Sequence, residues 1–508
     1  MNIARILANR CRAQGDRLAI RFEDRDWSYA DFDHEVERYA STLHGLGIAK
    51  GDRVAYQLAK RVEALFLHFA ILSLGAVALP LNPDYRPDEL EYFLTDSGSR
   101  LLIADAGAGA AARERLLDLP GLQILPVGGG AGSWDAALAG AVLPFARPYD
   151  AAGDDTAMLC YTSGTTGRSK GAMITHRNLA SNAEALHRTW NWTEQDRLLH
   201  VLPLFHVHGL NVAALGCLCA GATLTMHAKF EPGRAWKTLV RERCTLLMAV
   251  PTIYQRLMNA WEQFDPRPDL SSLRLFISGS APLSDTQFLR FEQQTGFRIL
   301  ERYGMTETGM ITSNLLDPER RIAKSVGYPL PGVEIRVVAP DQTPVNPGEI
   351  GEVWVRGANV FAGYWGMEEK TRESFVDGWF RTGDLGWCDR ADADRLYLAG
   401  RAKELIISGG FNVYPKEIEN VLEGHPGVRE SAVLGLPDDD YGERVVAVVV
   451  PRPDTVEGLE QELKTHCRER LSGYKCPRQY HFLGDLPRNA MGKLQKNVLA
   501  EMLADLPG

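Results

Sequence analysis

The sequence predicts an α/β fold, with mostly parallel sheets in a large N-terminal domain and a small α+β domain at the C-terminus. Short apolar runs such as RLLIAD (100–105), LLHVLPL (198–204), CTLLMAVP (244–251) and LRLFISG (273–279) alternate with helical stretches such as DELEYFLTDS (88–97). Continuous apolar runs of this length are typical of strands buried on both faces, and their alternation with helices favours parallel sheets. Ligands of such sheets bind in the loops that follow the strands.

The first seventeen residues, MNIARILANRCRAQGDR, predict an amphipathic helix, because charges interrupt the short apolar pattern that a secretion signal would need. The longest weakly polar run, NVAALGCLCAGATLTM (211–226), is too short and too rich in glycine to span a bilayer. Two patches rich in glycine and alanine, 105–113 and 127–142, predict surface connections or a small-residue helix. We therefore expect a cytoplasmic protein without a membrane span.

A change of pattern after about residue 330 predicts a β-rich subdomain. VEIRVV, GEIGEVWVRG and DRLYLAGR are short runs with alternating polarity, separated by turn residues. After residue 400, YPKEIENVLEGHPGV, ESAVLGLP, RVVAVVVP and GLEQELKTHCRERL predict a helix, two strands and a helix. We expect two domains, 1–400 and 401–508, with a hinge in GRAKELIISGGFNVYP (400–415), where paired glycines flank a short apolar strand.

Composition limits the classes of ligand. The 508 residues are 45% hydrophobic and 24% charged, as in globular proteins. Fifty-six basic against sixty-five acidic residues give a net charge of −9, so no general positive field exists to bind nucleic acid. The eight cysteines are scattered without metal-binding spacing, which suits a reducing compartment. An anionic ligand must therefore be bound by a local group of residues.

The stretch YTSGTTGRSKG (161–171) predicts a polyphosphate-binding loop. Its glycines allow backbone amides to approach phosphate oxygens closely, its hydroxyl side chains add donors, and Lys170 adds a positive charge. A flexible polar loop alone would not explain the embedded lysine and arginine. The spacing differs from GxxxxGK[ST], so this is not the P-loop of common nucleotide hydrolases.

This loop and four later segments carry a family resemblance. RYGMTE (302–307), RTGDLG (381–386), GRAKELIISGGFNVYP (400–415) and PRNAMGKLQK (487–496) follow it in order. Together they resemble the signatures of the adenylate-forming superfamily, which includes acyl-CoA synthetases, luciferases and peptide-synthetase adenylation domains. The resemblance implies a mobile C-terminal domain and a reaction in two halves: a carboxylate and ATP form acyl-adenylate and pyrophosphate, and a thiol then displaces AMP.

The resemblance also implies a role for each matching residue. Lys170 and the loop amides hold the β- and γ-phosphates, Tyr303 lies against adenine, and Asp384 and Arg401 hold the ribose hydroxyls. Thr306 contacts the α-phosphate, and Glu307 binds Mg²⁺. The residues implied in ATP binding are Thr162, Ser163, Gly164, Thr165, Thr166, Gly167, Lys170, Tyr303, Asp384 and Arg401.

A cation must offset the repulsion between carboxylate and triphosphate, which is about 4 kcal/mol for each charge pair at 4 Å and a dielectric near 20. Lys493 matches the family's lysine that bridges the carboxylate and the α-phosphate during adenylation. Losing one such preorganised donor costs about 10²–10³ in rate. The thiol-dependent half should not need Lys493.

The resemblance implies that the C-terminal domain rotates between the two half-reactions, since Lys493 and the thiol would enter the site from the same side. By resemblance Lys403 is the hinge residue, and Gly409 and Gly410 line the path of the thiol. Only fifteen residues follow Lys493, too few for a carrier domain, so free coenzyme A is the expected acceptor. A stand-alone adenylation enzyme that loads a separate carrier protein remains an alternative.

The acyl pocket is implied to lie among PLFHVHGLN (203–211), FISGSAPL (276–283) and the GMTE loop. By resemblance His206 closes over the acyl carboxylate, and GRSKGAM, ERYGMTET and SVGYPLPGVEIRV look most like malonyl-CoA synthetases. Malonate or methylmalonate needs a cation or several donors for its second carboxylate, because burying that group unpaired costs several kcal/mol. The acyl-site candidates are His206, Val207, His208, Ser280, Met305 and Arg274; Arg234 is a further cation, and no spacing argument chooses among them.

Three alternatives stay open. A synthetase for a short- or medium-chain or aromatic monocarboxylate would use the same core with a neutral pocket. Loading of a carrier protein would change only the acceptor. A non-catalytic nucleotide-binding interaction protein is the third; Lys170, Glu307, Asp384, Arg401 and Lys493 argue against it, because binding alone does not require Lys493.

Overall fold

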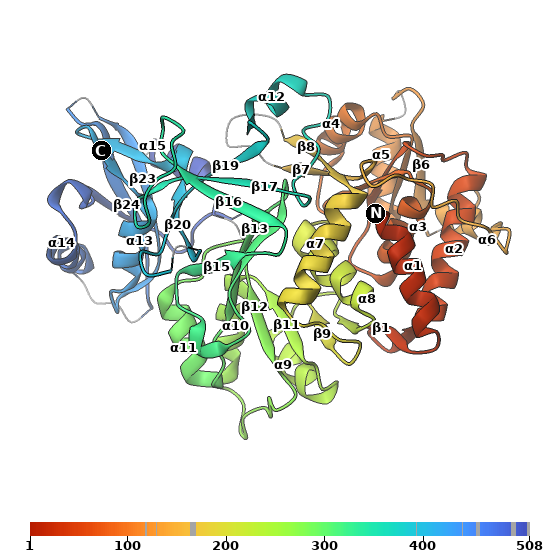
Figure 1. The fold of residues 1–508 in the computed structure, drawn as a ribbon, viewed down its shortest axis with the longest axis horizontal. Helices are drawn as coiled ribbons and strands as arrows, with labels where there is room; N and C mark the ends of the chain where they lie inside the picture. The colour runs from red at the N-terminus through yellow and green to blue at the C-terminus, as the bar shows by residue number, and fades with distance from the viewer. Residues whose placement is uncertain are drawn as a thin grey trace.

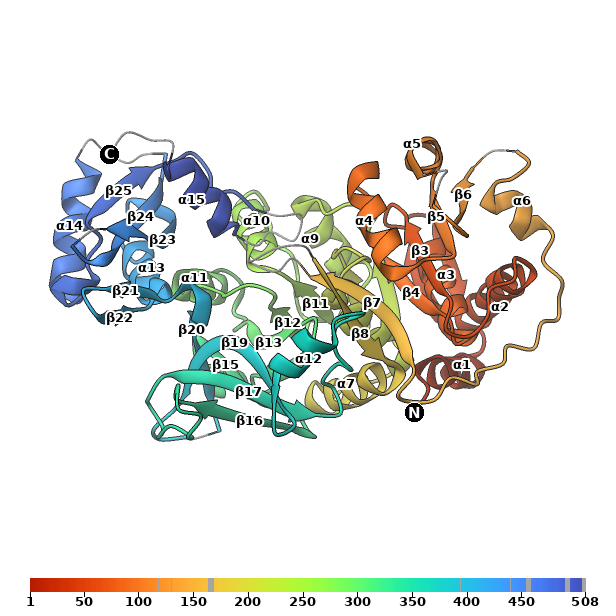
Figure 2. The same ribbon diagram turned by 90° about the horizontal axis from the view of Figure 1, so that it is seen from above.

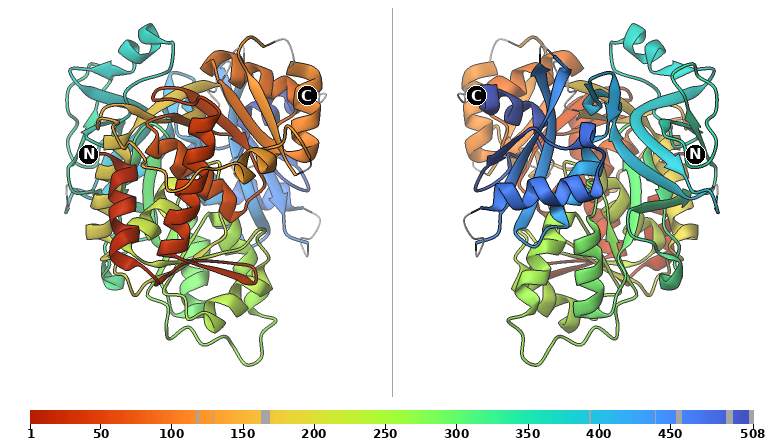
Figure 3. Two further views of the ribbon diagram at one scale, coloured as in Figure 1. Left: turned by 90° about the vertical axis from the view of Figure 1, so that its right-hand side faces the viewer. Right: turned by 90° about the vertical axis from the view of Figure 1, so that its left-hand side faces the viewer.

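The computed structural model describes residues 1–116, 119–128, 130–162, 169–392, 394–438, 440–453, 458–488 and 494–504. Two sheets and their helices form a large N-terminal domain, and a smaller α+β domain lies at the opposite end from the first helices (Figures 1 and 2). The two end views in Figure 3 show the red N-terminal helices on one end and the blue C-terminal elements on the other. The predicted fold class is confirmed.

The first sheet has the order β6-β5-β3-β4-β7-β8 and is parallel except for β8, which pairs antiparallel with β7. Helix α3 is buried along every residue except Glu63, which explains its uniformly apolar sequence. The strands are β3 (Arg53–Gln57), β4 (Val77–Pro80), β5 (Leu101–Asp105), β6 (Gln123–Val127), β7 (Thr156–Thr162) and β8 (Lys170–Thr175). The helices are α2 (Tyr29–Gly45), α3 (Val62–Ser73), α4 (Pro87–Ser97), α5 (Ala106–Leu116) and α6 (Trp134–Ala139).

The second sheet joins a parallel half to an antiparallel half. Strands β1, β10, β9, β11, β12 and β13 run parallel, and β14, β15, β20, β19, β17 and β16 continue the sheet as antiparallel neighbours. Its strands are β1 (Leu18–Phe22), β2 (Arg25–Ser28), β9 (Arg197–His200), β10 (Thr223–Met226), β11 (Leu246–Ala249), β12 (Leu275–Ser278), β13 (Leu300–Met305), β14 (Gly309–Ser313), β15 (Ser325–Pro329), β16 (Val333–Val338), β17 (Gly351–Gly357), β18 (Phe375–Val376), β19 (Trp379–Cys388) and β20 (Leu396–Arg401).

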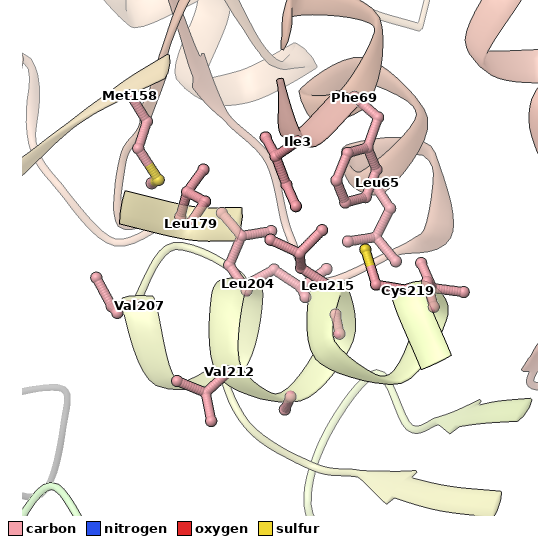
Figure 4. Packing of buried hydrophobic residues seen from close by; sticks show 14 of the residues in the cluster. Ile3, Leu65, Phe69, Met158, Leu179, Leu204, Val207, Val212, Leu215 and Cys219 are labelled. Atoms are coloured by element: carbon pink, nitrogen blue, oxygen red, sulfur yellow. The ribbon is translucent and has the colours of Figure 1, made fainter. Parts of the chain in front are cut away.

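One apolar core joins the helices of both sheets. Figure 4 shows Ile3, Leu65 and Phe69 above Leu215 and Cys219, so the N-terminal helices pack on the segment that follows β9. The helices of this half are α1 (Ile3–Gln14), α7 (His176–Thr189), the π-helix η1 (His208–Leu215), α8 (Gly216–Ala220), α9 (Pro232–Arg241), α10 (Pro251–Trp261), α11 (Asp285–Thr295), η2 (Pro318–Arg320) and α12 (Glu368–Glu373).

The C-terminal domain is a separate sheet covered by helices. Its order is β22-β21-β24-β23, and β25 pairs with β24. The last strand of the large sheet ends at Arg401, and β21 begins at Ile406. The strands are β21 (Ile406–Ser408), β22 (Phe411–Val413), β23 (Val428–Asp438), β24 (Gly442–Pro451) and β25 (Gln479–Phe482); the helices are η3 (Ala402–Glu404), α13 (Pro415–Glu423), α14 (Leu459–Arg470), η4 (Gly473–Lys475) and α15 (Lys496–Ala504).

The structure refines several predicted elements. The apolar run 198–204 is a strand only to His200, because the chain turns there into the loop that leads to the π-helix. The small-residue patch at 105–113 lies mainly in helix α5, and 211–226 divides into η1, α8 and β10. Among the residues that the structure describes, no helix has the length and apolar character of a membrane span.

Candidate active site

The loops after parallel strands β9, β12 and β13 meet at the carboxyl edge of the large sheet, as the sequence predicts. They carry PLFHVHG, Gly279-Ser280 and Thr306-Glu307, respectively. The three strands are neighbours through β11, so their carboxyl ends lie side by side. This edge brings together the candidates for the acyl and phosphate sites.

Tyr303, Asp384 and Arg401 form one connected group. Tyr303 donates its hydroxyl to Asp384 Oδ2 at 2.5 Å, and Arg401 Nε lies 2.8 Å from Asp384 Oδ1. Asp384 and Arg401 are direct cross-strand partners on β19 and β20. Burial and the neighbouring Asp384 charge raise the pKa of Tyr303 well above its usual value, so it stays a neutral donor. This preorganised carboxylate suits the hydroxyls of a ribose.

Glu307 and Lys170 meet at the ring of Tyr364. The Tyr364 hydroxyl donates to Glu307 Oε1 at 3.1 Å, while Lys170 Nζ lies 4.9 Å from the ring centroid. Burial lowers the pKa of Lys170. The positive charges of Lys370 and Lys403 lower this pKa further, and the negative charge of Glu307 partly opposes these effects. Positive charges that repel one another without a bound anion are expected where a polyphosphate binds. Glu307 is 6% exposed and presents the oxygen donors that Mg²⁺ prefers, so it fits that ion.

Aromatic side chains contact the described residues that follow the predicted phosphate-binding loop. Thr162 and Lys170 are cross-strand partners, and Tyr92 donates its hydroxyl to Ser169 O at 2.5 Å. A side chain at Gly171 would press against Tyr161 and Trp365. The predicted residues Ser163, Gly164, Thr165, Thr166, Gly167 and Lys493 lie outside the described residues.

A π-helix positions the two histidines of the acyl site. His208 opens the helix, and Leu210 N donates to His206 O at 2.8 Å. A side chain at Gly209 would collide with the carbonyl oxygen of Pro203, so only glycine permits this turn. His208 Nδ1 lies 3.0 Å from Ser280 Oγ. Burial and the nearby Arg302 charge lower the pKa of His208 well below its usual value, so the imidazole is neutral.

Arg302 is a buried cation close to the predicted acyl residues His208 and Ser280. It is 2% exposed, and its Nε and Nη2 atoms have no hydrogen-bond partner among the described residues. A side chain at Gly279 would collide with its guanidinium, so the group lies directly against the turn that carries Ser280. Ser278 Oγ is also buried and without a hydrogen-bond partner in the described chain. Burial lowers the pKa of Arg302 to about 9, and the group stays charged at neutral pH.

The two other arginines considered for the second carboxylate lie elsewhere. Arg274 precedes β12, at the opposite end of the strand from Ser280, and its Nε lies 2.7 Å from Asp196 Oδ1. Its guanidinium also donates to Trp190 O at 2.8 Å, so these donors form hydrogen bonds within the protein. Arg234 Nη2 pairs with Glu23 at 2.5 Å on the surface. The structure does not bring Arg274 to the acyl residues.

The remaining candidates lie around Thr306 and Glu307. Val207 is 6% exposed, and it lines a cavity of about 20 Å³ together with Asn211, Thr306 and Glu307. Met305 packs against the aromatic cluster that contains Tyr364. Val207 and Met305 therefore border the space between the acyl and phosphate residues.

The predicted hinge residue lies in the connection between the domains, and the predicted thiol-path residues lie in the first hairpin of the C-terminal domain. Lys403 is the central residue of η3, directly after Arg401 and Ala402. Gly409 and Gly410 form the two-residue turn of the β21–β22 hairpin, with φ of +59° and +80°. Positive φ at both positions requires glycine or a similarly permissive residue. Gly409 N also donates to Tyr441 O at 2.8 Å.

Sequence reasoning missed the roles of Arg302 and Tyr364. Arg302 stands in RYGMTE, and the available signal was a charged residue inside an otherwise buried strand, where arginine is rare without a partner. Tyr364 carried no such signal, because its contact with Glu307 joins residues 57 positions apart through tertiary packing.

Comparisons with known proteins match most of the chain. Residues 7–365 match the family of AMP-binding enzymes, and residues 417–493 match the AMP-binding enzyme C-terminal domain. The sulfoacetate–CoA ligase of Cupriavidus necator is 38% identical, over 89% of this chain and 87% of that protein. The feruloyl-CoA synthase of an Amycolatopsis species is 38% identical over 96% of both, and the mitochondrial malonate–CoA ligase of Mus musculus is 36% identical over 97% and 90%.

One related protein, MatB from Rhodopseudomonas palustris, has been solved in two states. The crystal structure of ATP-bound MatB from Rhodopseudomonas palustris shares 42% identity and covers 99% of both chains, with a TM-score of 0.92. The apo crystal structure of MatB, with the same identity and coverage, has a TM-score of 0.82. The arrangement described here is therefore more similar to the ATP-bound state than to the apo state.

Proposed function

Because the chain belongs to the family of AMP-binding enzymes and is an AMP-forming acyl-CoA ligase, we propose that its acid is malonate or methylmalonate. The enzyme is an acid–thiol ligase, with ATP and coenzyme A as substrates beside the acid. The proposal concerns the acid, the residues that recognise it and the order of domain movements.

The observation that carries the proposal is the buried Arg302 guanidinium, two of whose nitrogens have no hydrogen-bond partner in the part of the chain that the structure describes. A buried cation without a partner costs several kcal/mol, and an anionic ligand group would remove much of that cost. Ser280 and His208, which lie beside it, supply neutral hydrogen-bonding groups. A second carboxylate at this place would pair with Arg302, whereas a methyl or phenyl group would leave the charge unpaired.

The acids in the names of the relatives are compatible with a dicarboxylate substrate, but they do not identify the acid of this enzyme. Sulfoacetate and malonate each carry a second anionic group, and ferulate does not. All three relatives share nearly the same identity with this chain. The choice of a dicarboxylate therefore depends on Arg302.

In the first half-reaction a carboxylate oxygen of the acid attacks the α-phosphorus of ATP, and pyrophosphate leaves. Lys170 binds the leaving phosphates, and Asp384 and Arg401 orient the ribose. Glu307, supported by Tyr364, would hold Mg²⁺, which supplies charge neutralisation at the phosphates when bound. Lys493 is proposed to stabilise the charge that develops between carboxylate and α-phosphate, and His206 to border the carboxylate with Thr306.

In the second half-reaction the coenzyme A sulfur attacks the acyl carbon, and AMP leaves. We place the boundary of the mobile domain at residues 401–406, between β20 and β21, with Lys403 as the hinge. Gly409 and Gly410 would then line the thiol's path. A cytoplasmic location stays a prediction from the cysteine pattern.

The test is pyrophosphate release with ATP and Mg²⁺ across malonate, methylmalonate, acetate, butyrate, octanoate and benzoate, with and without coenzyme A. We expect turnover that is fastest with malonate or methylmalonate and stimulated by coenzyme A. Preference for a monocarboxylate would reject the dicarboxylate pocket and keep the ligase chemistry. Stimulation by a carrier protein but not by coenzyme A would show that the acceptor is the carrier protein.

A further inference from the structure

The turn between β13 and β14 carries Thr306 and Glu307, and helix α7 lies against the hairpin that contains it. Asn182 of α7 forms two hydrogen bonds with the backbone of Met310. Its Nδ2 donates to Met310 O at 2.9 Å, and its Oδ1 accepts from Met310 N at 3.1 Å. The side-chain amide thus pairs with this residue as a neighbouring strand would. Asn182 is 8% exposed, so water competes little for these two bonds.

A close contact fixes Asn182 against the start of β14. Gly309 has a φ of +58°, and a side chain at this position would meet Asn182 Oδ1 at 2.7 Å. Glycine suits both this backbone conformation and so close an approach. The amide that binds Met310 therefore also lies directly against the first residue of β14, two positions after Glu307.

The segment 358–361 also binds the turn. Asn359 Nδ2 donates to Thr308 O at 2.9 Å, and Phe361 N donates to Glu307 O at 2.8 Å. Asn359 is only 5% exposed, so its bond to the turn is shielded from water as well. The main chain of the turn is therefore held from this segment as well as from α7.

Asn178 joins these two supports. Its Nδ2 donates to Ala358 O at 2.9 Å and to Val360 O at 2.7 Å. Asn178 and Asn182 stand one helical turn apart on α7, so they lie on the same face of that helix. The 358–361 segment and the β13–β14 hairpin are thus both bound to one face of α7.

Packing alone does not fix the turn. A cavity of about 20 Å³ borders it, and the residues that line this cavity include Thr306, Glu307, Asn182 and Asn359. Because the turn faces a void at this place, hydrogen bonds from the side-chain amides contribute strongly to where its backbone lies. Helix α7 follows β8 directly, so the same helix connects the strand of Lys170 with the turn of Glu307.

We propose that Asn182 and Asn359 are positioning residues for magnesium binding, which act through the backbone of the turn by fixing where the Glu307 carboxylate lies. This inference rests on the proposed role of Glu307 as the residue that binds Mg²⁺. Tyr364 donates to that carboxylate directly, whereas the two asparagines bind the main chain beside it. In this role neither asparagine contacts the metal.

Binding of ATP in the absence of the acid tests this role apart from catalysis. Isothermal titration calorimetry measures the Kd of Mg²⁺·ATP and, in EDTA, the Kd of metal-free ATP. Replacing a group that orients a metal ligand commonly costs about 10–100-fold in metal affinity or activity. For Asn182→Ala and Asn359→Ala we expect Mg²⁺·ATP to bind about tenfold more weakly, and metal-free ATP to bind within about twofold of wild type. Equal weakening of both forms, or unchanged binding of Mg²⁺·ATP, would overturn the proposal.

Asn314→Ala is the matched control. Asn314 is 2% exposed, and its Nδ2 donates to Glu301 O at 3.0 Å and to Ser325 O at 2.6 Å, so this variant also loses buried side-chain hydrogen bonds. It follows β14 directly, at the opposite end of that strand from the turn. We expect a similar fall in melting temperature and an unchanged Kd for Mg²⁺·ATP. If this control weakened Mg²⁺·ATP as much as the other two variants, the cause would be a general loss of stability, and the proposal would be wrong.

Asn359→Ala keeps the proposal testable if Asn182→Ala does not fold, because the Asn182–Met310 pair stays intact in it. A double-mutant cycle then asks whether Asn359 acts through Glu307. In a Glu307→Gln background, adding Asn359→Ala should weaken Mg²⁺·ATP binding by no more than about twofold further, since residues that act as a unit are not additive. A second full loss would overturn the proposal.

Failure of the proposed function and failure of this inference give different results. Glu307→Gln is measured first in the same binding assay. If it leaves the Kd of Mg²⁺·ATP unchanged, Glu307 has no role in metal binding, and this inference is wrong together with that role. If it weakens Mg²⁺·ATP binding whereas Asn182→Ala and Asn359→Ala do not, only the positioning role is rejected. The choice of acid is not involved, because the assay contains none.

Discussion

Single residues with strong local charges define the chemistry of this site. Arg302 is a buried cation without hydrogen-bond partners for two of its nitrogens among the described residues, and Glu307 is a buried carboxylate that accepts from Tyr364. Each is expensive to bury alone, and each faces a region where a ligand of opposite charge would stabilise it. These two residues lead to the first two predictions.

Arg302→Gln should change the choice of acid. Replacing the cation removes a buried ion pair with the second carboxylate, so kcat/KM for malonate should fall by about 10²-fold or more. Butyrate, which lacks that carboxylate, should be affected much less. The measurement is kcat/KM for both acids by pyrophosphate release.

The control for this prediction is Arg321→Gln. Arg321 is also a buried arginine, but it donates to Leu315 O at 2.9 Å and Arg298 O at 2.6 Å and has no place in the acyl site. This variant should lose thermal stability and keep the ratio of malonate to butyrate activity. A similar drop for both acids in Arg302→Gln would remove Arg302 from acid recognition.

Glu307→Gln should raise the Mg²⁺ concentration needed for half-maximal adenylation by about tenfold, because the amide is a weaker ligand for a hard cation. A magnesium titration of pyrophosphate release measures this effect. Glu319→Gln is the control, since the Glu319 side chain is 80% exposed on η2, and it should leave the titration unchanged. An unaltered titration for Glu307→Gln would exclude this residue from metal binding.

At the scale of elements, the π-helix η1 links the core to the acyl residues. It begins at His208, and its buried face packs under the N-terminal helices through residues such as Leu215 (Figure 4). Gly209 permits the close approach to Pro203, and His200 Nε2 lies 2.8 Å from Gly209 O. π-Helical turns occur often at functional sites, and this one begins at His208, directly after His206 and Val207.

Gly209→Ala should displace this turn. The added methyl group would strike a backbone carbonyl that cannot move independently, so we expect a lower melting temperature and a loss of about tenfold or more in kcat/KM. Gly216→Ala is the matched control in the next helix, where the nearest atom to an added methyl is Asn211 O at 3.9 Å. Alanine there should be neutral or stabilising, by up to about 1 kcal/mol. Equal behaviour of the two variants would contradict the steric argument.

Elements were easier to predict from the sequence than contacts. The continuous apolar runs of β5, β11 and β12 and the amphipathic pattern of α4 and α13 report local periodicity, and the structure places elements at each of them. The short apolar strand β21 was predicted, but its pairing with β22 and the helix α15 were not, because these segments have only short apolar runs. Asp384 and Arg401 were assigned to one site only through family resemblance. Their cross-strand pairing could not be predicted, because the register of two strands depends on the whole sheet. Arg274 shows the reverse error: a cation near a promising loop in sequence lies at the wrong end of its strand.

At the scale of the whole molecule, two domains meet through a short connection. The large sheet ends at Arg401, and the next sheet begins at Ile406, so few residues are available to change the relation between domains. The arrangement seen here is more similar to ATP-bound than to apo MatB. We propose that thiol transfer uses a second arrangement, which arises by rotation at this connection.

Lys403→Pro should therefore separate the two half-reactions. Proline restricts φ to about −65° and removes the backbone donor, which hinders rotation while this arrangement is retained. We expect adenylation to stay within about threefold of wild type, and thiol transfer to fall by tenfold or more in single-turnover measurements. Lys403→Ala is the control for loss of the charge. Unchanged thiol transfer in the proline variant would exclude a hinge at this residue.

Strand β13 has a further consequence for how acid specificity can evolve. Arg302 contacts the Gly279 turn, while its neighbour Tyr303 reaches Asp384, because adjacent side chains of a strand point to opposite faces. In the proposed roles, the residue that recognises the acid and the residue that supports nucleotide recognition are therefore adjacent, with α-carbons about 3.8 Å apart. Under this proposal, point substitutions at position 302 should change the preferred acid and leave the nucleotide in place. An insertion or deletion in β13 would shift both recognition groups at once, so new acids are accessible by substitution and not by changes of length.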